Sequence, residues 1–545
     1  MKKILTTWKI AAILLIISTS VAVTSFNHSK YFEISKNIEI YANLYKEINT
    51  YYVDDLDPAQ LMRSGVDAML EGLDPYTNYI SESEIEGYRY ITEGKYNGIG
   101  AMIHKIKENI VVTDIYENQP AFNAGIRAGD RILSIDGKST NGKSIEDVYN
   151  ILKGYPQTEV VIELISPNQK KKTLTLVRDE VKVPNVPYSG MVSEKVGYIT
   201  LTTFTREAGK NVSKALQQLL AENPNMEGVI LDLRGNGGGL LAEAVNVCNI
   251  FIPKGSPVVS TRGKVKEWDR NYKTLNQPIN TDIRLVVLIN KNSASASEIV
   301  SGVIQDLDRG VLMGHLSYGK GLVQNVRDVG YNSKVKLTTA KYYIPSGRCI
   351  QAVKYENGKP VHIPESQRTA FKTRSGRKVL DGGGIMPDIK LPETEDLEVV
   401  EDLKKNYVIF DYVTDYCVKH PKTPDFDTYS FNQVDDFFKY LSSKQYDFNS
   451  ETKDVLKSVE EKASKEGYLN DIKAQVASIK KTINNKREEE LKGHKSVMKN
   501  ILEKEIANRY FYEKGKIKVM LRNDPEVQEA VKLLMDKNKY NKILK

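Results

Sequence analysis

The 545-residue sequence has only three cysteines, and they lie far apart at Cys248, Cys349 and Cys417. Without C-x-x-C spacing or a dense cysteine pattern, the sequence predicts neither a zinc site nor a disulfide framework. The six histidines form no H-E-x-x-H motif, so the common metalloprotease signature is absent. We therefore expect no metal ion and no other cofactor.

The sequence also has only a small excess of positive over negative charge. Lys and Arg total 78 against 70 Asp and Glu, a net charge of +8, and no long basic block occurs before residue 390. This excludes a nucleic-acid binder that depends mainly on a basic, phosphate-tracking arm. A hydrophobic fraction of 40% excludes a polytopic membrane protein. At about 150 residues per domain, the sequence predicts a globular protein of several domains.

The N-terminus differs from this bulk composition. Lys2, Lys3 and Lys9 come before an uncharged, largely apolar stretch over residues 10–27, a pattern typical of an export signal. The stretch is near the lower limit of about 17 residues for a spanning helix, so a cleaved signal peptide and a retained membrane anchor both stay open. We expect residues 1–29 to direct the protein to the periplasm or the cell envelope, and residues 33–92 to form a helical region.

Between residues 95 and 180 the pattern changes to short strands separated by turns. We expect strands at 99–106, 110–115, 131–135, 160–165 and 172–177 and a helix at 144–152. The segment Gly98-Ile99-Gly100-Ala101 and the run from Pro120 to Gly137 resemble a PDZ domain.

A loop of this kind exposes consecutive N–H groups that can bind a terminal carboxylate, while the next strand edge pairs with a peptide. We expect Gly98 and Gly100 to form that loop, and an apolar side-chain pocket to be lined by Ile99, Ala101, Val148 and Leu152. The expected partners are proteins with unfolded or apolar C-termini. The alternative is that the glycines only make a tight turn and that the four apolar residues are core.

From residue 185 to 390 strands alternate with helices, which predicts an α/β layered domain. The expected strands are 196–204, 228–233 and 285–290, and the expected helices are 206–222, 240–251 and 296–307. The functional site of such a sheet lies at the carboxyl ends of its strands. Residues 391–545 are charged with helical spacing, so we expect amphipathic helices there and no catalytic residue.

Three clusters lie in this α/β region: DLRGNGGGL at 232–240, NKNSASASE at 290–298 and SYGKGLVQ at 317–324. Together they resemble the tail-specific, or C-terminal processing, serine peptidases, and a preceding PDZ domain fits the order of parts in that family. The resemblance implies a multidomain α/β protein with a crotonase-like peptidase core. It also implies that Ser295 is the nucleophile and Lys320 its base.

The chemistry agrees with these roles. No histidine stands in an obvious triad sequence, so Lys320 between two glycines is the best base, and burial would have to lower its pKa by about three units from 10.4. Gln324 can orient the lysine without stabilising its charge. For the oxyanion we expect the backbone N–H groups of Ala296, at a helix N-terminus, and Gly238, with Gly237 and Gly239 as the next choices.

Each residue alone has a simpler explanation. Ser293, Ser295 and Ser297 could cap a helix, Lys320 could be a surface turn residue, and the glycine run could be a phosphate loop. His315 stands where the resembling family commonly has an acidic residue. A Ser-His pair is less favoured because Lys320 is intact, so we interpret His315 as structural or as a pH-sensitive neighbour.

Taken together, the sequence predicts an exported serine endopeptidase that binds substrate C-termini through the PDZ domain. The alternative is a noncatalytic PDZ scaffold or chaperone of envelope proteins, and a third hypothesis is a hydrolase of small acyl compounds on a crotonase-like core. A membrane tether through the N-terminal segment and assembly into a homo-oligomer are both compatible with this organisation.

Overall fold

The computed structural model describes residues 30–392, 397–426 and 428–545, and the predicted export segment lies outside them. The chain divides into two compact units, one reaching to Tyr79 and including Tyr355–Lys359, the other containing the remainder. Within the described residues no helix is long and apolar enough to cross a membrane.

The described part of the first unit is mainly helical. Residues 30–51 are helical, and α2 spans Pro58–Glu71. Asp57 caps α2, because its Oδ1 accepts the N–H groups of Ala59 and Gln60 at 2.8 and 3.3 Å. The helical pattern expected here is confirmed, and it continues in the second unit with α3 (Ile85–Glu93).

The segment that resembles a PDZ domain is an antiparallel sheet with strand order β3-β4-β5-β7-β8. Its strands are β3 (Ala101–Ile106), β4 (Asn109–Ile115), β5 (Arg131–Ile135), β7 (Glu159–Ile165) and β8 (Lys171–Val177). Helix α5 (Ile145–Leu152) begins at a capping box in which Ser144 Oγ accepts the N–H of Asp147 at 3.1 Å. All five strands and the helix lie within two residues of the bounds that the sequence predicts. Strands β2 (Lys95–Gly98) and β9 (Asp179–Lys182) pair where the segment begins and ends.

The α/β domain is built on a sheet with strand order β10-β11-β12-β15-β16-β23, parallel except for β10. The strands are β10 (Tyr188–Ser193), β11 (Val196–Thr200), β12 (Gly228–Asp232), β15 (Arg284–Ile289), β16 (Val311–Gly314) and β23 (Ile389–Lys390). The expected βαβα alternation is confirmed by α6 (Ala208–Glu222), α7 (Leu241–Phe251) and α8 (Ala296–Asp306).

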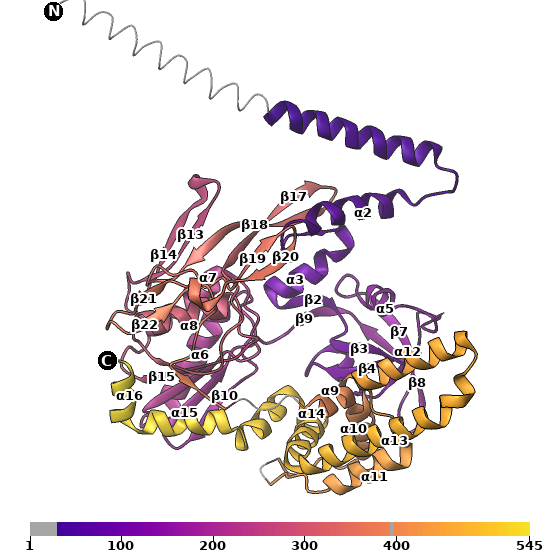
Figure 1. Cartoon of the computed structure of the whole chain (residues 1–545). Coiled ribbons are helices and arrows are strands. Elements are labelled where there is room, and N and C mark those ends of the chain that lie inside the picture. The colour runs from indigo at the N-terminus through magenta and orange to yellow at the C-terminus, as the bar shows by residue number, and fades with distance from the viewer. Residues whose placement is uncertain (1–29, 393–396, 427) are drawn as a thin grey trace, which may run out of the picture. The chain divides into compact units, whose positions relative to one another are not determined.

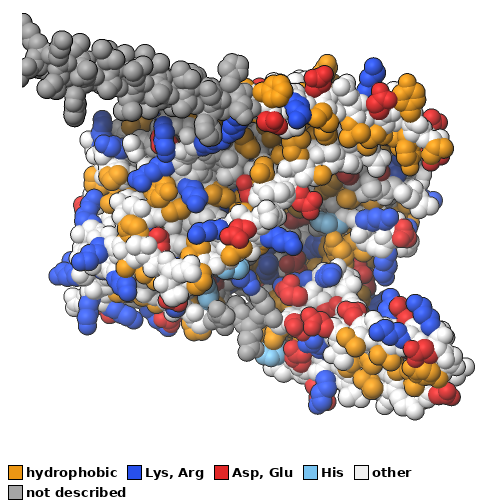
Figure 2. Space-filling model, turned by 45° about the horizontal axis from the view of Figure 1, so that its top comes forward, with side chains coloured by type: hydrophobic (Ala, Val, Ile, Leu, Met, Phe, Trp, Pro, Cys, Tyr) orange, Lys and Arg blue, Asp and Glu red, His pale blue; other side chains and the backbone are white. Residues whose placement is uncertain are grey.

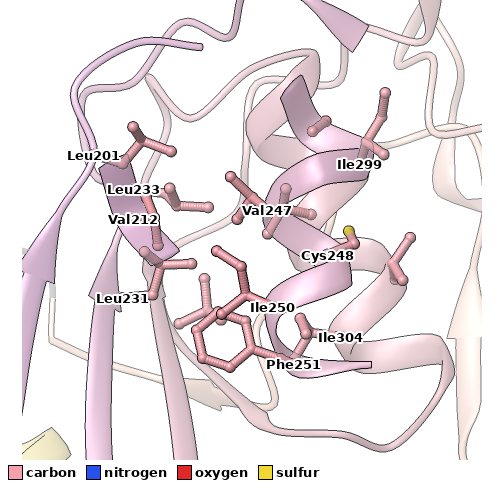
Figure 3. Close-up of a cluster of buried hydrophobic side chains, with 14 of the residues drawn as sticks. Leu201, Val212, Leu231, Leu233, Val247, Cys248, Ile250, Phe251, Ile299 and Ile304 are labelled. Atoms are coloured by element: carbon pink, nitrogen blue, oxygen red, sulfur yellow. The ribbon is translucent and has the colours of Figure 1, made fainter. Parts of the chain in front are cut away.

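Apolar clusters cover both faces of this sheet. On one face, Leu231 of β12 packs with Phe251 of α7 and Ile304 of α8 in a large buried cluster (Figure 3). On the other face, Ile230 of β12 packs with Leu534 of α15 (Pro525–Met535) in a second cluster. Burial on both faces explains why these strands are continuous apolar runs without alternation.

A second, antiparallel sheet contains β13 (Pro257–Gly263), β14 (Arg270–Lys273), β17 (Leu322–Gly330) and β18 (Ser333–Tyr343). Strand β17 starts two residues after Lys320, so this sheet carries the chain away from the predicted base. Its pairing partner β18 brings Tyr342 back alongside the start of β17, where Leu322 pairs with Lys341.

The expected C-terminal helices are also confirmed. They are α9 (Glu398–Lys405), α10 (Val408–Lys419), α11 (Val434–Lys444), α12 (Glu451–Glu466), α13 (Leu469–Gly493) and α14 (Lys495–Arg522). All of them except α12 contribute to a hydrophobic core of their own. The last two helices, α15 and α16 (Lys537–Ile543), instead pack on the α/β sheet (Figure 1). The face shown in Figure 2 carries both basic and acidic side chains.

Candidate active site

Ser295 lies at the turn between β15 and α8, as the N-cap of the helix. Its backbone has φ 55° and ψ −111°, a strained conformation that residues other than glycine adopt rarely. The neighbouring serines are buried and serve the fold: Ser293 Oγ donates to Leu233 O at 2.9 Å, and Ser297 Oγ donates to Asn236 O at 2.8 Å. Strain at a strand-to-helix turn is typical of an exposed nucleophile, and it singles out the middle serine.

Ser295 faces a cavity of about 450 Å³. All five residues that the sequence predicts for catalysis line this cavity, namely Ser295, Lys320, Gln324, Gly238 and Ala296. The side chains of Tyr88 and Ile91, from α3, form part of the wall. A larger cavity of about 690 Å³ beside Trp268 contains none of the five residues. The structure therefore brings the predicted catalytic residues together in one place.

The backbones of Ser295 and Lys320 are joined by the buried carboxylate of Glu298. Glu298 Oε2 accepts the N–H of Ser295 at 2.8 Å and the N–H of Lys320 at 2.9 Å, while Oε1 accepts Ser317 Oγ at 2.6 Å and the Gly319 N–H at 2.7 Å. Burial raises the pKa of the Glu298 carboxyl to about 7, against the opposing effect of these donors. The sequence interpretation gave Glu298 no role, although it stands in the same motif as Ser295.

Tyr342 makes a second connection between the two loops. Its hydroxyl lies 3.1 Å from Ser295 O and 2.5 Å from Lys320 O, within hydrogen-bond distance of both carbonyls. The tyrosine is almost fully buried at the end of β18. No local sequence pattern indicated this residue, because it reaches the site through the pairing of two strands.

The glycine loop, residues 233–240 between β12 and α7, lies against the nucleophile Ser295. A Cβ atom on Gly238, where φ is +101°, would come within 2.8 Å of the Ser295 Cβ and 3.0 Å of the Ala296 N, so no larger residue fits. The N–H of Gly238 donates to Asn236 Oδ1 at 2.9 Å, however, which directs this predicted oxyanion donor away from the cavity. Gly237 and Gly239 also line the cavity.

Gln324, the predicted partner of Lys320, lies on β17. Its Nε2 donates to Thr338 Oγ1 on the paired strand at 3.1 Å. This hydrogen bond holds the amide side chain at the cavity wall, where both Gln324 and Lys320 are found.

The parts of the chain match known families in the order that the fold shows. Residues 195–358 match the model of peptidase family S41, residues 111–165 match a PDZ domain, and residues 399–534 match a "Probable PDZ-protease, C-terminal helical domain". The chain is 33% identical over 321 residues to a carboxy-terminal-processing protease of Bartonella bacilliformis, covering 58% of this chain and 73% of that protein. The chain belongs to peptidase family S41.

Two further proteins are also similar to the chain. The chain is 32% identical over 335 residues to a probable CtpA-like serine protease of Staphylococcus aureus, covering 61% of this chain and 66% of that protein. It is 27% identical to the photosystem II D1 C-terminal processing protease, covering 64% of this chain and 85% of that one, at a TM-score of 0.35 that is too low to compare the arrangement of parts. The protein is a C-terminal processing serine peptidase of the Ser/Lys dyad type, and the predicted family, fold class and enzyme class are confirmed.

In the PDZ domain of this S41 peptidase, the four residues predicted to line a peptide pocket are packed in the domain core. They are Ile99, Ala101, Val148 and Leu152. The predicted carboxylate loop is close by: Gly98 pairs with Asp179 in the β2–β9 ladder, and Gly100, at φ +76°, accepts the N–H of Tyr116 at 3.1 Å. Packing of these side chains agrees with the core alternative, and a role in peptide binding stays a prediction.

The hydroxyl of Tyr149, on α5, lies 3.1 Å from the N of Ile103 and 3.2 Å from its O. Ile103 belongs to β3, the edge strand to which a peptide would be added. Tyr149 therefore occupies polar backbone groups that a bound peptide would need, a feature that the sequence interpretation missed.

His315, the departure from the family pattern, lies outside the cavity wall. Its Nδ1 is 3.4 Å from Glu526 Oε1 of α15, and its Nε2 is 3.3 Å from Pro392 O. These contacts place the imidazole against α15, which agrees with the structural interpretation of His315.

Proposed function

We propose that this S41 peptidase cleaves protein substrates presented by their C-termini, with Ser295 as nucleophile and Lys320 as general base. The observation that carries the proposal is the single cavity shared by Ser295 and Lys320, whose backbones are held together by Glu298 and Tyr342. A nucleophile and a base need this fixed proximity to react as a pair.

In the first step Lys320 Nζ takes the proton from Ser295 Oγ as the oxygen attacks the scissile carbonyl carbon. The new C–O bond gives a tetrahedral oxyanion, which the Ala296 N–H at the start of α8 and an N–H of the glycine loop would stabilise. The protonated lysine then donates its proton to the leaving amine as the C–N bond breaks. Water, deprotonated by Lys320, hydrolyses the acyl-enzyme and restores Ser295.

The PDZ domain supplies the proposed specificity for an apolar C-terminus. The Gly98–Ala101 loop precedes the edge strand β3, the arrangement in which a terminal carboxylate and an added strand can bind together. The N-terminal sequence, with its lysines before an apolar stretch, supports export to the cell envelope as part of this proposal.

The test is digestion of an unfolded protein that ends in apolar residues, compared with the same protein ending in charged residues. We expect faster cleavage of the apolar form, mass-spectrometric cut sites in the polypeptide chain, and no cleavage by Ser295→Ala. Equal rates for both forms would contradict PDZ selection. Binding without any cleavage would favour the scaffold or chaperone, and cleavage of esters alone would favour the small acyl hydrolase.

A further inference from the structure

Two carboxylates at the start of α15 reach the glycine loop of the active site. Arg234 Nη1 lies 2.6 Å from Glu526 Oε2, and Arg234 Nη2 lies 2.8 Å from Asp524 Oδ2. The same guanidinium also binds Asp232, at the end of β12, through Nε at 3.0 Å to each carboxylate oxygen. Although 290 residues separate Arg234 from Asp524, the start of α15 thus contacts the loop that follows β12 directly.

This ion-pair cluster is shielded from solvent. The side chain of Arg234 is 18% exposed, and those of Asp524 and Glu526 are 12% and 13% exposed. Burial alone would lower the pKa of the Arg234 guanidinium, but Asp232 and Asp524 raise it well above its usual value. Removing one carboxylate from such a cluster disturbs the positions of the other charged groups far more than removing one partner of a surface ion pair does. The reason is that little water is available to take the place of the missing carboxylate.

Glu526 also contacts the lysine loop, residues 315–321 between β16 and β17. Its other oxygen, Oε1, lies 3.4 Å from Nδ1 of His315, the residue that follows β16. Two residues later, Ser317 donates its hydroxyl to Glu298 at 2.6 Å, and Lys320 follows in the same loop. One carboxylate of α15 therefore touches both the glycine loop and the lysine loop.

The glycine loop is hydrogen-bonded to the residues on either side of Ser295, so the contacts of Arg234 also affect the position of the nucleophile. Asn236, two residues after Arg234, accepts the N–H of Ala294 at 3.0 Å and the hydroxyl of Ser297 at 2.8 Å through its backbone carbonyl. Ala294 and Ser297 flank Ser295. A shift of Arg234 would thus move the loop that lies against the nucleophile and carries the proposed oxyanion donor.

We propose that Glu526, together with Asp524, is a positioning residue for peptide-bond hydrolysis: from α15 it fixes the glycine loop and the lysine loop relative to Ser295. The proposal rests on the proposed roles of Ser295 and Lys320. Neither carboxylate lines the cavity, so we infer an effect on the alignment of the oxyanion donors and not on substrate binding. The C-terminal helical region then contributes to catalysis through α15.

The experiment compares full-length wild type with Glu526→Gln, Asp524→Asn, Glu529→Gln and Ser295→Ala. Asn retains the helix cap that Asp524 forms with the N–H groups of Glu526 and Val527, while removing the charge that pairs with Arg234. Glu529 is a matched control on the same helix, where it pairs with Lys532 and is 48% exposed. For each variant kcat and KM are measured on a peptide, with the affinity for a peptide boronate that forms a tetrahedral adduct with serine.

For Glu526→Gln and Asp524→Asn we expect kcat to fall about tenfold, boronate affinity to fall by a similar factor, and KM to stay within about twofold. Glu529→Gln should match wild type, and circular dichroism should show all variants folded. The inference is overturned if the two variants have wild-type kcat while Ser295→Ala is inactive, or if they lose KM and kcat together. Full activity of Ser295→Ala would instead overturn the proposed function. If Glu526→Gln does not fold, Asp524→Asn alone decides between these outcomes.

Discussion

At the scale of single residues, Glu298 connects the two segments of the chain that carry Ser295 and Lys320. Its two oxygens accept hydrogen bonds from four donors, two of them the backbone N–H groups of Ser295 and Lys320. A glutamine of the same shape would turn its NH₂ group towards two of these donors, because an amide has only one acceptor oxygen. We expect Glu298→Gln to lower kcat at least tenfold with a smaller effect on KM, and a wild-type kcat would contradict the positioning of both residues by this carboxylate.

Glu298 should also make stability depend on pH. The pKa of its carboxyl rises from 4.5 to about 7 in the folded protein, mainly because it is buried. Between these two pH values the folded state therefore binds more protons than the unfolded state. The stability that the Glu298 carboxyl contributes is complete below pH 4.5 and is lost as the pH rises through 7.

The comparison uses two proteins that both carry Ser295→Ala, which prevents self-digestion: one keeps Glu298 and the other has Glu298→Gln. Over this pH range the free energy of unfolding of the protein with Glu298 should fall by up to about 3 kcal/mol more than that of the Glu298→Gln protein. Urea titrations at about pH 5 and pH 8 measure the difference between the two proteins. Parallel pH dependence of both proteins would refute the effect.

At the scale of secondary-structure elements, the edge strand of the PDZ domain is already partly occupied. Tyr149 holds its hydroxyl against the N and O atoms of Ile103, the groups through which β3 would pair with a peptide. Peptide binding must break these contacts, each worth about 1 kcal/mol net, before new ones can form. The domain should therefore bind C-termini more weakly than an open edge would.

We expect Tyr149→Phe to increase the affinity for a peptide with an apolar C-terminus about threefold to tenfold. Phenylalanine keeps the ring and removes only the hydroxyl that competes for the strand edge. Isothermal titration of the full-length Ser295→Ala protein measures the change, with Tyr155→Phe, an exposed tyrosine of the same domain, as control. Unchanged or weaker binding by Tyr149→Phe would show that the hydroxyl does not compete with the peptide.

At the scale of the whole molecule, the last segment of the chain completes the catalytic domain. The sequence predicts amphipathic helices after residue 390. Most of the helices from α9 to α14 share a separate core, but α15 returns to the α/β sheet. Leu534 is fully buried there, with its Cβ 3.1 Å from where a Cβ of Gly228 would be. The sheet thus has helices on both faces, and one layer comes from the far end of the chain.

Leu534→Ala should lower the free energy of unfolding of this domain by about 2–5 kcal/mol, the usual cost of a cavity in a packed core. The matched control is Val455→Ala on α12, where the side chain is 63% exposed and the expected cost is below about 0.5 kcal/mol. Thermal and denaturant unfolding of both variants give the comparison. Equal stability of Leu534→Ala and wild type would mean that α15 is not part of the catalytic domain.

Much of this organisation could be predicted from sequence because it is local. Strand and helix periodicity predicted the secondary-structure elements. The family resemblance of the three motifs predicted the roles of Ser295 and Lys320, which share one cavity. Contacts between distant segments could not be predicted in this way. Tyr342 meets Ser295 through strand pairing, and Arg234 meets Asp524 across 290 residues. The side-chain hydrogen bond that holds the Gly238 N–H likewise depends on the folded shape of its loop.

The most direct test of the proposed Ser295/Lys320 dyad is the rate of peptide cleavage by Ser295→Ala and Lys320→Ala beside Lys336→Ala. Lys336 lines the same cavity, so its removal controls for loss of a positive charge there. We expect the first two variants to fold and to lose at least about a thousandfold in kcat, and Lys336→Ala to stay within about tenfold of wild type. Cleavage at the wild-type rate by either Ser295→Ala or Lys320→Ala would contradict the dyad.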